Sequence, residues 1–422
     1  MFKVYGANNL HTIPQIHLLT EEQQLAIKVV AQVLPFKVNQ YVIDELIDWD
    51  NVPNDPVFQL TFPQPGMLDE KDYNELREHI VAHKETKHIV NRIRQSLNPH
   101  PAGQQTLNIP TLDNEPLEGM QHKYRETVLF FPARGQTCHS YCTFCFRWPQ
   151  FIGDNDLKFS SSESTHLLNY LKEHKEVTDL LVTGGDPMIM RSHHLAEYLL
   201  PLLAPEFDHI QNIRIGTKVL SFWPQRFLTD KDSYALLELL TRLVRRGKHV
   251  AIMTHINHWQ EIQTPIAKEA IRRLRDTGAV LRSQSPLVKH INDDPNVWAK
   301  MWAEQVRLGI IPYYMFIERD TGAKKYFELP LYKAYEIYND AIKQVSGLSR
   351  TVRGPSMSCT PGKVEIQGIT EIKGEKVFIL RMLQCRNPEY SYQTFFAEYN
   401  EDACWLDDLK PAFGESKFFF EN

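Results

Sequence analysis

The chain has 422 residues, of which 42% are hydrophobic and 23% are charged, and its formal net charge is −5. This length allows one large domain with additions or two to three smaller domains. The slightly negative charge and the absence of a long basic run argue against nucleic acid or an anionic membrane surface as a partner. The sequence has no membrane helix of about 18 apolar residues, no signal-peptide pattern and too few cysteines for a disulfide framework, so we expect a cytoplasmic protein.

The N-terminal part predicts a helical extension and linker over residues 1–120. Thr20-Glu-Glu-Gln23 forms a capping-box pattern at the start of one helix, and residues 38–49 form a second amphipathic segment. Apolar residues recur at helical spacing over residues 70–97, which predicts one long exposed helix. Residues 99–120 are rich in proline, glycine and polar residues, and we expect them to form the linker.

The central part alternates short apolar runs with helical patterns from about residue 126 onwards. Six strands alternating with helices predict an α/β fold with a parallel sheet and right-handed crossovers, here a partial (βα)6 barrel of the TIM type. We expect this barrel over residues 121–334 and a C-terminal α+β extension over residues 335–422. The predicted strands cover residues 128–131, 179–183, 212–216, 249–255, 279–283 and 310–317, and the predicted helices cover residues 164–174, 194–203, 231–246, 265–277 and 296–308.

Three of the six cysteines, Cys138, Cys142 and Cys145, lie within eight residues, directly after the first predicted strand. Barrel enzymes of this type carry their chemistry at the C-terminal ends of the strands. Thiolates are the ligands of iron–sulfur clusters, and three of them would leave one iron of a [4Fe–4S] cluster open. A structural zinc site is the alternative, but zinc takes four ligands and the nearest fourth candidate, His139, breaks the usual spacing. Three unrelated core cysteines, or an electron-transfer or metal-binding protein without a substrate, are further alternatives.

The C-x3-C-x2-C spacing resembles the signature of the radical S-adenosylmethionine (SAM) superfamily. The resemblance implies the partial barrel of radical SAM enzymes, with SAM bound to the open iron. It also implies a reductant such as flavodoxin or ferredoxin, because an electron from the cluster cleaves SAM and yields a 5′-deoxyadenosyl radical.

Further motifs narrow the resemblance to the lysine 2,3-aminomutase family, whose members use both SAM and pyridoxal 5′-phosphate (PLP). The match covers roughly residues 55–365. It implies an isomerase that moves an amino group from Cα to Cβ of an amino acid, and an enzyme of the same ancestry that has lost PLP is the alternative. The motifs are Thr183-Gly-Gly-Asp-Pro-Met188, Ile213-Arg-Ile-Gly-Thr217, His255-Ile-Asn-His258, Gln284-Ser285, Ile291-Asn-Asp293 and Ile311-Pro-Tyr-Tyr314.

The family resemblance assigns the loop of Gly184, Gly185 and Asp186 to SAM. The two glycines let the backbone approach a ligand closely, and Asp186 can accept a hydrogen bond from the amino group of SAM. An ordinary Gly-Gly-Asp-Pro turn is the alternative interpretation.

The resemblance also places a PLP-binding lysine after a glycine-rich run, and Lys363 stands in the corresponding stretch. This run is longer than the family pattern and has few of its glycines, so a solvated surface lysine is the alternative. Gln284 and Arg125 are weaker candidates for the PLP ring and phosphate.

Three arginines are candidates for binding the substrate. The resemblance places Arg147 at the α-carboxylate, which a guanidinium can hold bidentately. Arg319 and Arg353 stand where lysine-specific members carry two aspartates, so the pocket would favour a distal carboxylate such as that of glutamate or aspartate. The alternative is that these arginines pair with local acids such as Glu318 or Asp320.

The cysteines outside the motif do not reproduce the zinc-binding cluster of the lysine enzymes. We therefore expect no structural zinc at Cys385 and Cys404, and a homo-oligomer is left open. Cys359 lies close to Lys363 and is interpreted as a buried small hydrophobe, with a reactive role as the alternative.

Overall fold

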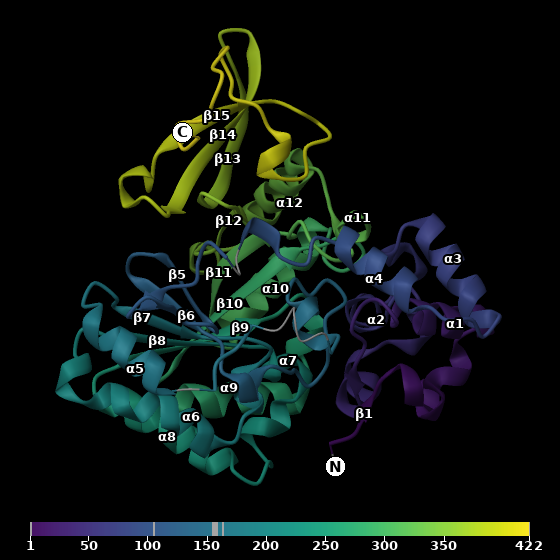
Figure 1. Ribbon diagram of the computed structural model, residues 1–422, viewed down its shortest axis with the longest axis horizontal. Helices are drawn as coiled ribbons and strands as arrows, with labels where there is room; N and C mark the ends of the chain where they lie inside the picture. The colour runs from purple at the N-terminus through teal and green to yellow at the C-terminus, as the bar shows by residue number, and fades with distance from the viewer. Residues whose placement is uncertain (1, 104–105, 154–158, 163, 422) are drawn as a thin grey trace.

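The computed structural model describes residues 2–103, 106–153, 159–162 and 164–421. Its main feature is an eleven-stranded sheet in the order β15-β14-β13-β12-β11-β10-β9-β8-β7-β6-β5. Strands β6 to β12 run parallel to one another, while β5 at one edge and β13 to β15 at the other run antiparallel to their neighbours. Figure 1 shows the curved parallel part at the centre and the β13–β15 ribbon above it.

The six predicted strands are all present in the parallel part, which confirms the α/β fold and its partial barrel. They are β6 Thr127–Phe130, β7 Asp179–Val182, β8 Asn212–Thr217, β9 His249–His255, β10 Val280–Leu287 and β11 Ile310–Ile317. The remaining strands of this sheet are β5 Met120–Tyr124, β12 Arg353–Ser358, β13 Gly362–Ile372, β14 Glu375–Cys385 and β15 Thr394–Glu398.

The five helices predicted between these strands are also present, with ends shifted by a few residues. Each has an apolar stripe that packs on the sheet, as in α8, where Leu236, Leu240 and Leu243 are buried. Figure 1 shows α5, α6 and α8 together outside β6 to β8. The five helices are α5 Ser164–Glu173, α6 Ser192–Leu199, α8 Ser233–Arg245, α9 Pro265–Asp276 and α10 Pro295–Arg307, and shorter or later helices are α7 Val219–Phe222, α11 Lys324–Phe327 and α12 Leu331–Lys343.

The N-terminal extension is helical, but two of its predicted elements are wrong. Residues 70–97 form two helices, α3 (Glu70–Val81) and α4 (Lys87–Ser96), because His83 adopts a left-handed backbone with φ of 52° and ends the first helix. Residues 38–49 are not a helix of ordinary length, since β2 (Val38–Asn39) pairs with β1 (Val4–Tyr5) before a short π-helical turn.

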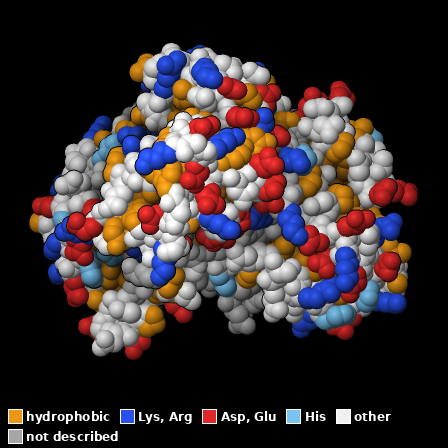
Figure 2. All heavy atoms as spheres, turned by 90° about the horizontal axis from the view of Figure 1, so that it is seen from above, with side chains coloured by type: hydrophobic (Ala, Val, Ile, Leu, Met, Phe, Trp, Pro, Cys, Tyr) orange, Lys and Arg blue, Asp and Glu red, His pale blue; other side chains and the backbone are white. Residues whose placement is uncertain are grey.

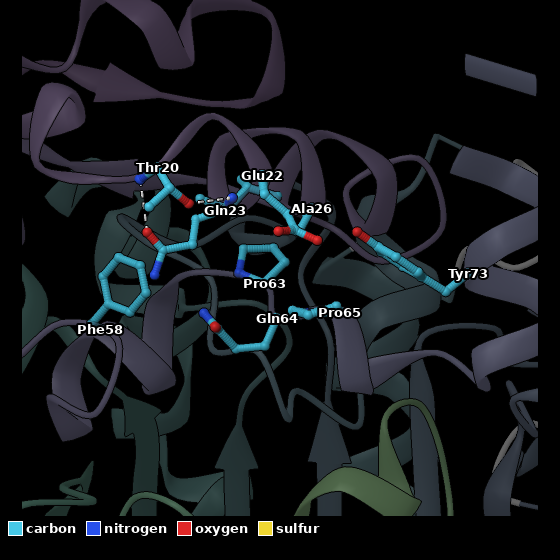
Figure 3. Close-up of a pocket in the computed structure, with 10 residues that line it drawn as sticks. Thr20, Glu22, Gln23, Ala26, Phe58, Pro63, Gln64, Pro65 and Tyr73 are labelled. Atoms are coloured by element: carbon cyan, nitrogen blue, oxygen red, sulfur yellow. Dashed lines mark hydrogen bonds between the residues drawn. The ribbon is translucent and has the colours of Figure 1, made fainter. Parts of the chain in front are cut away.

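Two further helices complete this extension, α1 (Glu21–Val30) and α2 (Pro56–Thr61). The predicted capping box at the start of α1 is confirmed, because the Gln23 amide N–H donates to Thr20 Oγ1 while the Gln23 side chain accepts from the Thr20 N–H. A pocket of about 370 Å³ lies beside this box and is lined only by residues of the extension (Figure 3).

The predicted linker contributes structure of its own. It contains a small hairpin, β3 (Thr111–Leu112) with β4 (Glu115–Pro116), and it ends in β5, which pairs with β6 at the edge of the sheet. At the other end, β12 and β13 continue the same sheet past residue 335. The division into three domains stays a prediction.

The surface has mixed charge, and Figure 2 shows acidic and basic side chains interspersed over the face viewed from above. Among the described residues, no helix is both long and apolar enough to cross a bilayer.

Asn39 joins the N-terminal extension to the barrel. It is 0% exposed, its Nδ2 donates to the carbonyl of Phe222 at 2.8 Å, and its Oδ1 accepts from the Val42 N–H at 3.1 Å. Its own backbone N–H donates to Ser140 Oγ at 3.0 Å. Asn39 therefore connects the extension to the segment after β8 through its side-chain amide, and to the cysteine loop through its backbone N–H.

We predict that Asn39→Ala lowers the free energy of unfolding by about 2 kcal/mol or more, because it leaves buried backbone groups without partners at roughly 1–3 kcal/mol each. Urea denaturation followed by circular dichroism measures the change. The exposed Asn54 provides the control, and Asn54→Ala should shift the midpoint little. Equal midpoints for the two variants would contradict the connecting role of Asn39.

Candidate active site

The cysteine loop follows β6 at the C-terminal end of the parallel strands. Cys138, Cys142 and Cys145 are free thiols, and each lies within electrostatic range of the other two. The loop turns tightly around them, because the Cys145 N–H donates to the Cys142 carbonyl at 3.1 Å and the Trp148 N–H donates to the Cys145 carbonyl at 3.0 Å. The structure therefore brings the three predicted ligands together on one loop.

The N-terminal extension holds this loop from the outside through its backbone. The Tyr141 N–H donates to the carbonyl of Lys37 at 2.8 Å, and the Thr143 N–H donates to the carbonyl of Leu60 at 2.9 Å. Thr143 Oγ1 also donates to the carbonyl of Gln59 at 2.7 Å. No function of the extension was predicted from the sequence. These hydrogen bonds indicate that the extension fixes the path of the cysteine loop.

Each thiol has a cation of its own. Burial raises the pKa of Cys138 well above its ordinary value, and Lys37 acts against this shift. Burial likewise raises the pKa of Cys142, against which Lys218 acts. Burial raises the pKa of Cys145 to about 11, with the Arg147 N–H and guanidinium acting against it.

Three partly buried, unpaired thiols with nearby cations are the donor set that an iron–sulfur cluster requires, since the cations offset the charge of the thiolates. The residues present therefore fit the cluster that the spacing predicts.

The glycine loop after β7 packs directly on the segment that leads into the cysteine loop. A Cβ atom on Gly184, whose φ is 147°, would lie 2.2 Å from Gln136 Nε2, and a Cβ atom on Gly185 would lie 2.5 Å from the Thr137 backbone nitrogen. The Asp186 N–H donates to the carbonyls of Gly135 and Thr137 at 2.9 and 2.8 Å. Gly185 needs glycine because the Thr137 backbone occupies the space of a side chain, and Gly184 needs it because its positive φ strains any other residue.

The carboxylate of Asp186 is 2% exposed and is occupied by protein donors. It accepts from Thr217 Oγ1 at 2.7 Å, from the Lys218 N–H at 2.8 Å and from the Met188 N–H at 3.0 Å. Burial raises the pKa of Asp186 to about 6, while these hydrogen bonds act against the rise. The side chain therefore ties the end of β7 to the end of β8, and its contact with the amino group of SAM stays a prediction.

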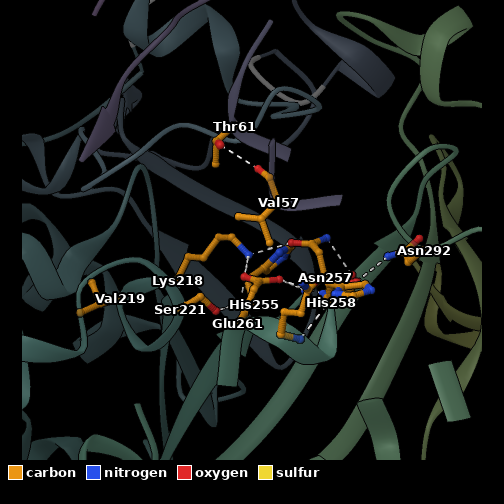
Figure 4. A network of polar contacts seen from close by, with 12 residues as sticks. Val57, Thr61, Lys218, Val219, Ser221, His255, Asn257, His258, Glu261 and Asn292 are labelled. Atoms are coloured by element: carbon orange, nitrogen blue, oxygen red, sulfur yellow. Dashed lines mark hydrogen bonds and ion pairs between the residues drawn. The ribbon is translucent and has the colours of Figure 1, made fainter. Parts of the chain in front are cut away.

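A buried ion pair extends this connection to β9 and β10 (Figure 4). Lys218 Nζ lies 2.5 Å from Glu261 Oε2 and donates to Asn257 Oδ1 at 2.8 Å. The other Glu261 oxygen accepts from the N–H groups of Asn257 and His258 at 2.6 and 2.8 Å. Asn257 Nδ2 in turn donates to Ser285 Oγ at 2.8 Å. The ends of four consecutive strands thus share one polar network.

A cavity of about 250 Å³ lies beside the cysteine loop and the ends of the strands. It brings together three of the predicted site residues, Lys363, Gln284 and Arg319. Aromatic and charged side chains make up much of its wall. Those used below are Lys123, Tyr124, Phe144, Phe146, Arg214, His255, Tyr314, Glu318 and Gln384.

Lys363 lies at the start of β13, opposite Ser358 of β12. Its Nζ is 4.3 Å from the centre of the Tyr314 ring and donates to Gln384 Oε1 at 3.3 Å. Burial lowers the pKa of Lys363 to about 7, and the cations of Arg214, Arg353 and Lys123 lower it further in the same direction. A large fraction of this amine is therefore neutral and nucleophilic near neutral pH.

The structure does not bring Arg125 to the cavity, since this residue is exposed in the turn between β5 and β6. Lys123, two residues earlier on β5, lines the cavity instead. It donates to the carbonyl of Cys359, and burial lowers the pKa of Lys123 to about 7. No strand was predicted between the linker at residues 99–120 and the first predicted strand at residues 128–131, so β5 was missed. Gln121, Lys123 and Tyr124 of this strand all line the cavity.

Arg147 is buried, Arg319 is partly buried, and both guanidinium groups lie near the ring of Phe146. Their guanidinium carbons are 5.6 and 5.2 Å from the centre of Phe146. Arg147 Nη1 and Arg319 Nε have no hydrogen-bond partner in the described part of the chain. Burial and the neighbouring Arg319 lower the pKa of Arg147 to about 9.

Two further expectations concerned the pairing of Arg319 with Glu318 or Asp320 and the place of Arg353 in the substrate pocket. Within the described ranges, Arg319 forms no ion pair with Glu318 or Asp320. Arg353 does not line the cavity, and its guanidinium stacks 4.6 and 4.7 Å from the rings of Tyr313 and Tyr314.

Two other residues of the cavity wall, Glu318 and His255, have pKa values that burial shifts. Burial raises the pKa of Glu318 well above its ordinary value, against the effect of Arg319. Burial and the charge of Lys218 lower the pKa of His255 to about 3, so its imidazole is neutral. Within the described part of the chain, Arg319 therefore lies in the cavity wall without an ion-pair partner, whereas Arg214 pairs with Asp179 at 2.8 Å.

Comparison with known proteins agrees with the motifs, although no family model matches the sequence. The chain is 31% identical to a protein of Aquifex aeolicus named "Putative L-lysine 2,3-aminomutase" over 402 residues, which is 95% of each chain. The chain belongs to the lysine 2,3-aminomutase family. Members of this family are radical SAM isomerases, and an iron–sulfur cluster, SAM and PLP are their typical cofactors.

Other relatives in the family differ in their substrates. The L-lysine 2,3-aminomutase of Acetoanaerobium sticklandii is 27% identical over 81% of this chain and 72% of its own. The glutamate 2,3-aminomutase of Clostridioides difficile is 31% identical over 50% of this chain and 47% of its own. Streptococcus suis SuiB bound to S-adenosylmethionine superposes with a TM-score of 0.38 at 12% identity, over 65% of this chain and 58% of that one, a similarity too distant to carry an argument.

We predict that Gly185→Ala displaces the glycine loop from the cysteine loop, because the new methyl group meets backbone that cannot rotate away. Overpacking of this kind costs about 1–3 kcal/mol, so SAM affinity should fall roughly tenfold or more. Equilibrium dialysis with the reconstituted protein measures it. Gly347→Ala is the matched control, because a Cβ atom there meets nothing within 4 Å. Unchanged SAM affinity in Gly185→Ala would refute the assignment of this loop.

Proposed function

We propose that this aminomutase moves the amino group of an acidic amino acid, such as glutamate or aspartate, from Cα to Cβ, with SAM and PLP as cofactors. The observation that carries the proposal is a single cavity beside the cysteine loop that contains a partly neutral lysine, Lys363, and a partly buried arginine, Arg319, which has no carboxylate partner in the described part of the chain. A reductant such as flavodoxin or ferredoxin, and a homo-oligomeric state, stay predictions.

In this proposal Cys138, Cys142 and Cys145 hold the cluster, and the loop of Gly184, Gly185 and Asp186 orients SAM. Bound together, the cluster and SAM supply a 5′-deoxyadenosyl radical, and PLP supplies a conjugated system over which an unpaired electron spreads. The protein supports the SAM loop through the hydrogen bonds that Asp186 accepts from Thr217 and Lys218. The apolar rings of Phe144 and Phe146 limit water around the reacting carbon.

Lys363 is the residue that would bind PLP covalently, because its amine is buried and its pKa is lowered to about 7. Gln284 at the end of β10 and Tyr314 on β11 line the same cavity and are placed to orient the ring. Lys123 replaces Arg125 as the proposed partner of the PLP phosphate, since Lys123 lines the cavity and Arg125 is exposed. These contacts favour the PLP-dependent enzyme over a relative that has lost PLP.

The charge of the cavity supports an acidic substrate. Arg319 lines it without an ion-pair partner in the described part of the chain, and Lys123, Lys363 and Arg214 line it as well, although Arg214 pairs with Asp179. An ammonium at the end of a lysine side chain would be repelled there, while a carboxylate would be attracted. Arg147 is then available for the α-carboxylate and Arg319 for the distal one, as two charge-assisted contacts from guanidinium groups that both lie near Phe146.

We predict that PLP is attached to Lys363 in a form that borohydride fixes, and that Lys363→Ala abolishes the label. The attachment rate should rise as the pH increases towards 7 and level off above it, because only the neutral amine reacts and its pKa is about 7. Peptide mapping by mass spectrometry locates the label. Lys123→Ala should keep the label on Lys363 but require more PLP, because Lys123 is the proposed partner of the phosphate, and Lys373→Ala, which alters an exposed lysine, is the control. Label on Lys123 in the unaltered protein would show that Lys123, and not Lys363, is the lysine that binds PLP.

We predict that Arg319→Ala weakens binding of glutamate or aspartate by about 2–5 kcal/mol, the usual cost of removing one partner of a buried charged contact. Arg353→Ala should cost less, because Arg353 lies outside the cavity wall. Anaerobic turnover with a panel of amino acids, with α and β isomers separated, measures both. A preference for lysine that is lost in Glu318→Gln would contradict the proposal. It would identify Glu318 as the acid that binds the side-chain ammonium of lysine.

A further inference from the structure

Lys37 belongs to the N-terminal extension, yet its side chain reaches the start of the cysteine loop. Its Nζ donates to Thr137 Oγ1 at 2.6 Å and lies 4.6 Å from the centre of the Tyr141 ring. Thr137 directly precedes Cys138, and the charge of Lys37 acts on that thiol. The backbone of the same residue accepts from the Tyr141 N–H at 2.8 Å. Lys37 is therefore held beside the first cysteine by contacts at both ends.

The three cations near the cysteines differ in how their charges are balanced. Lys218, beside Cys142, is 2.5 Å from Glu261, so much of its charge is offset within the protein. Arg147, beside Cys145, lies with Arg319 on Phe146 at the substrate cavity. Lys37 contacts the neutral hydroxyl of Thr137 and the ring of Tyr141, and it forms no ion pair with a carboxylate in the described part of the chain.

We propose that Lys37 is a positioning residue whose uncompensated positive charge raises the reduction potential of the cluster held by Cys138, Cys142 and Cys145. The inference rests on the proposed cluster site. Uptake of one electron from an external donor adds a negative charge to the cluster. A nearby cation in a partly buried site stabilises that charge more than it would in water. Net charge and hydrogen bonding around the sulfurs are established determinants of such potentials.

The proposal separates the charge of Lys37 from its hydrogen bond. Lys37→Met removes both, Lys37→Gln removes the charge and keeps a donor towards Thr137, and Lys37→Arg keeps both. Thr137→Val removes the acceptor and keeps the charge. If charge is the cause, the first two variants should share a more negative potential. Lys37→Arg and Thr137→Val should then stay close to the unaltered protein.

The experiment is an anaerobic redox titration of the reconstituted full-length protein without SAM, with the reduced cluster followed by electron paramagnetic resonance. Iron per chain is measured in every variant, and Lys3→Met, which alters an exposed lysine, is the control. A more negative midpoint in Lys37→Met and Lys37→Gln at unchanged iron content is the expected result. It should appear as a smaller reduced fraction at a fixed potential.

Two outcomes would overturn the inference. An unaltered midpoint in Lys37→Gln at full iron content would show that the charge does not act on the cluster. Loss of iron in both Lys37→Met and Lys37→Gln would assign Lys37 to holding the loop rather than to its potential. The failure of the proposed function is distinct, because it would appear as an unaltered protein that takes up no cluster at all.

Discussion

The buried ion pair between Lys218 and Glu261 is the interaction on which the arrangement of the site depends. Glu261 is 0% exposed, and removing one partner of such a pair typically costs about 3–5 kcal/mol, because the other charge is left in a low dielectric. The pair is stabilised here because every nearby donor and acceptor is used: the backbone of Asn257 and His258, and the Asn257 side chain. Through the Lys218 N–H, the same network fixes Asp186 and the loop that precedes it.

The site is divided by charge into two regions that meet at the cysteine loop. On the strand side, the charge of Lys218 is compensated by Glu261, and the carboxylate of Asp186 is stabilised by hydrogen bonds. The charged groups of this region therefore have partners within the protein. On the cavity side, Arg147 Nη1 and Arg319 Nε have no hydrogen-bond partner in the described part of the chain, and burial raises the pKa of Glu318. The strand side, whose charged groups have partners, holds the neighbouring loops in place. The cavity side has arginines without carboxylate partners among the described residues and attracts an anion.

The barrel could be predicted from the sequence because each of its elements is encoded by residues that are close together in the chain. Each strand is a short apolar run, each helix has its own apolar stripe, and the spacing of the three cysteines is a property of eight consecutive residues. The break between α3 and α4 was missed because a single left-handed residue, His83, interrupts a pattern that is otherwise continuous. Lys37 and Lys123 were missed for another reason. Their roles arise from contacts with Thr137 and Cys359, far away in the chain, and no local pattern encodes such a contact.

The hydrogen bonds between the N-terminal extension and the cysteine loop also imply an order in which the site can be built. Lys37, Asn39, Gln59 and Leu60 are synthesised before the loop that they hold, and the network through Glu261 is complete long before β13 delivers Lys363. A growing chain therefore possesses the whole framework of the cysteine loop while the cavity still lacks the wall that carries its lysine. The metal-binding half of this protein can mature during synthesis, and the half that would hold PLP can close only at the end.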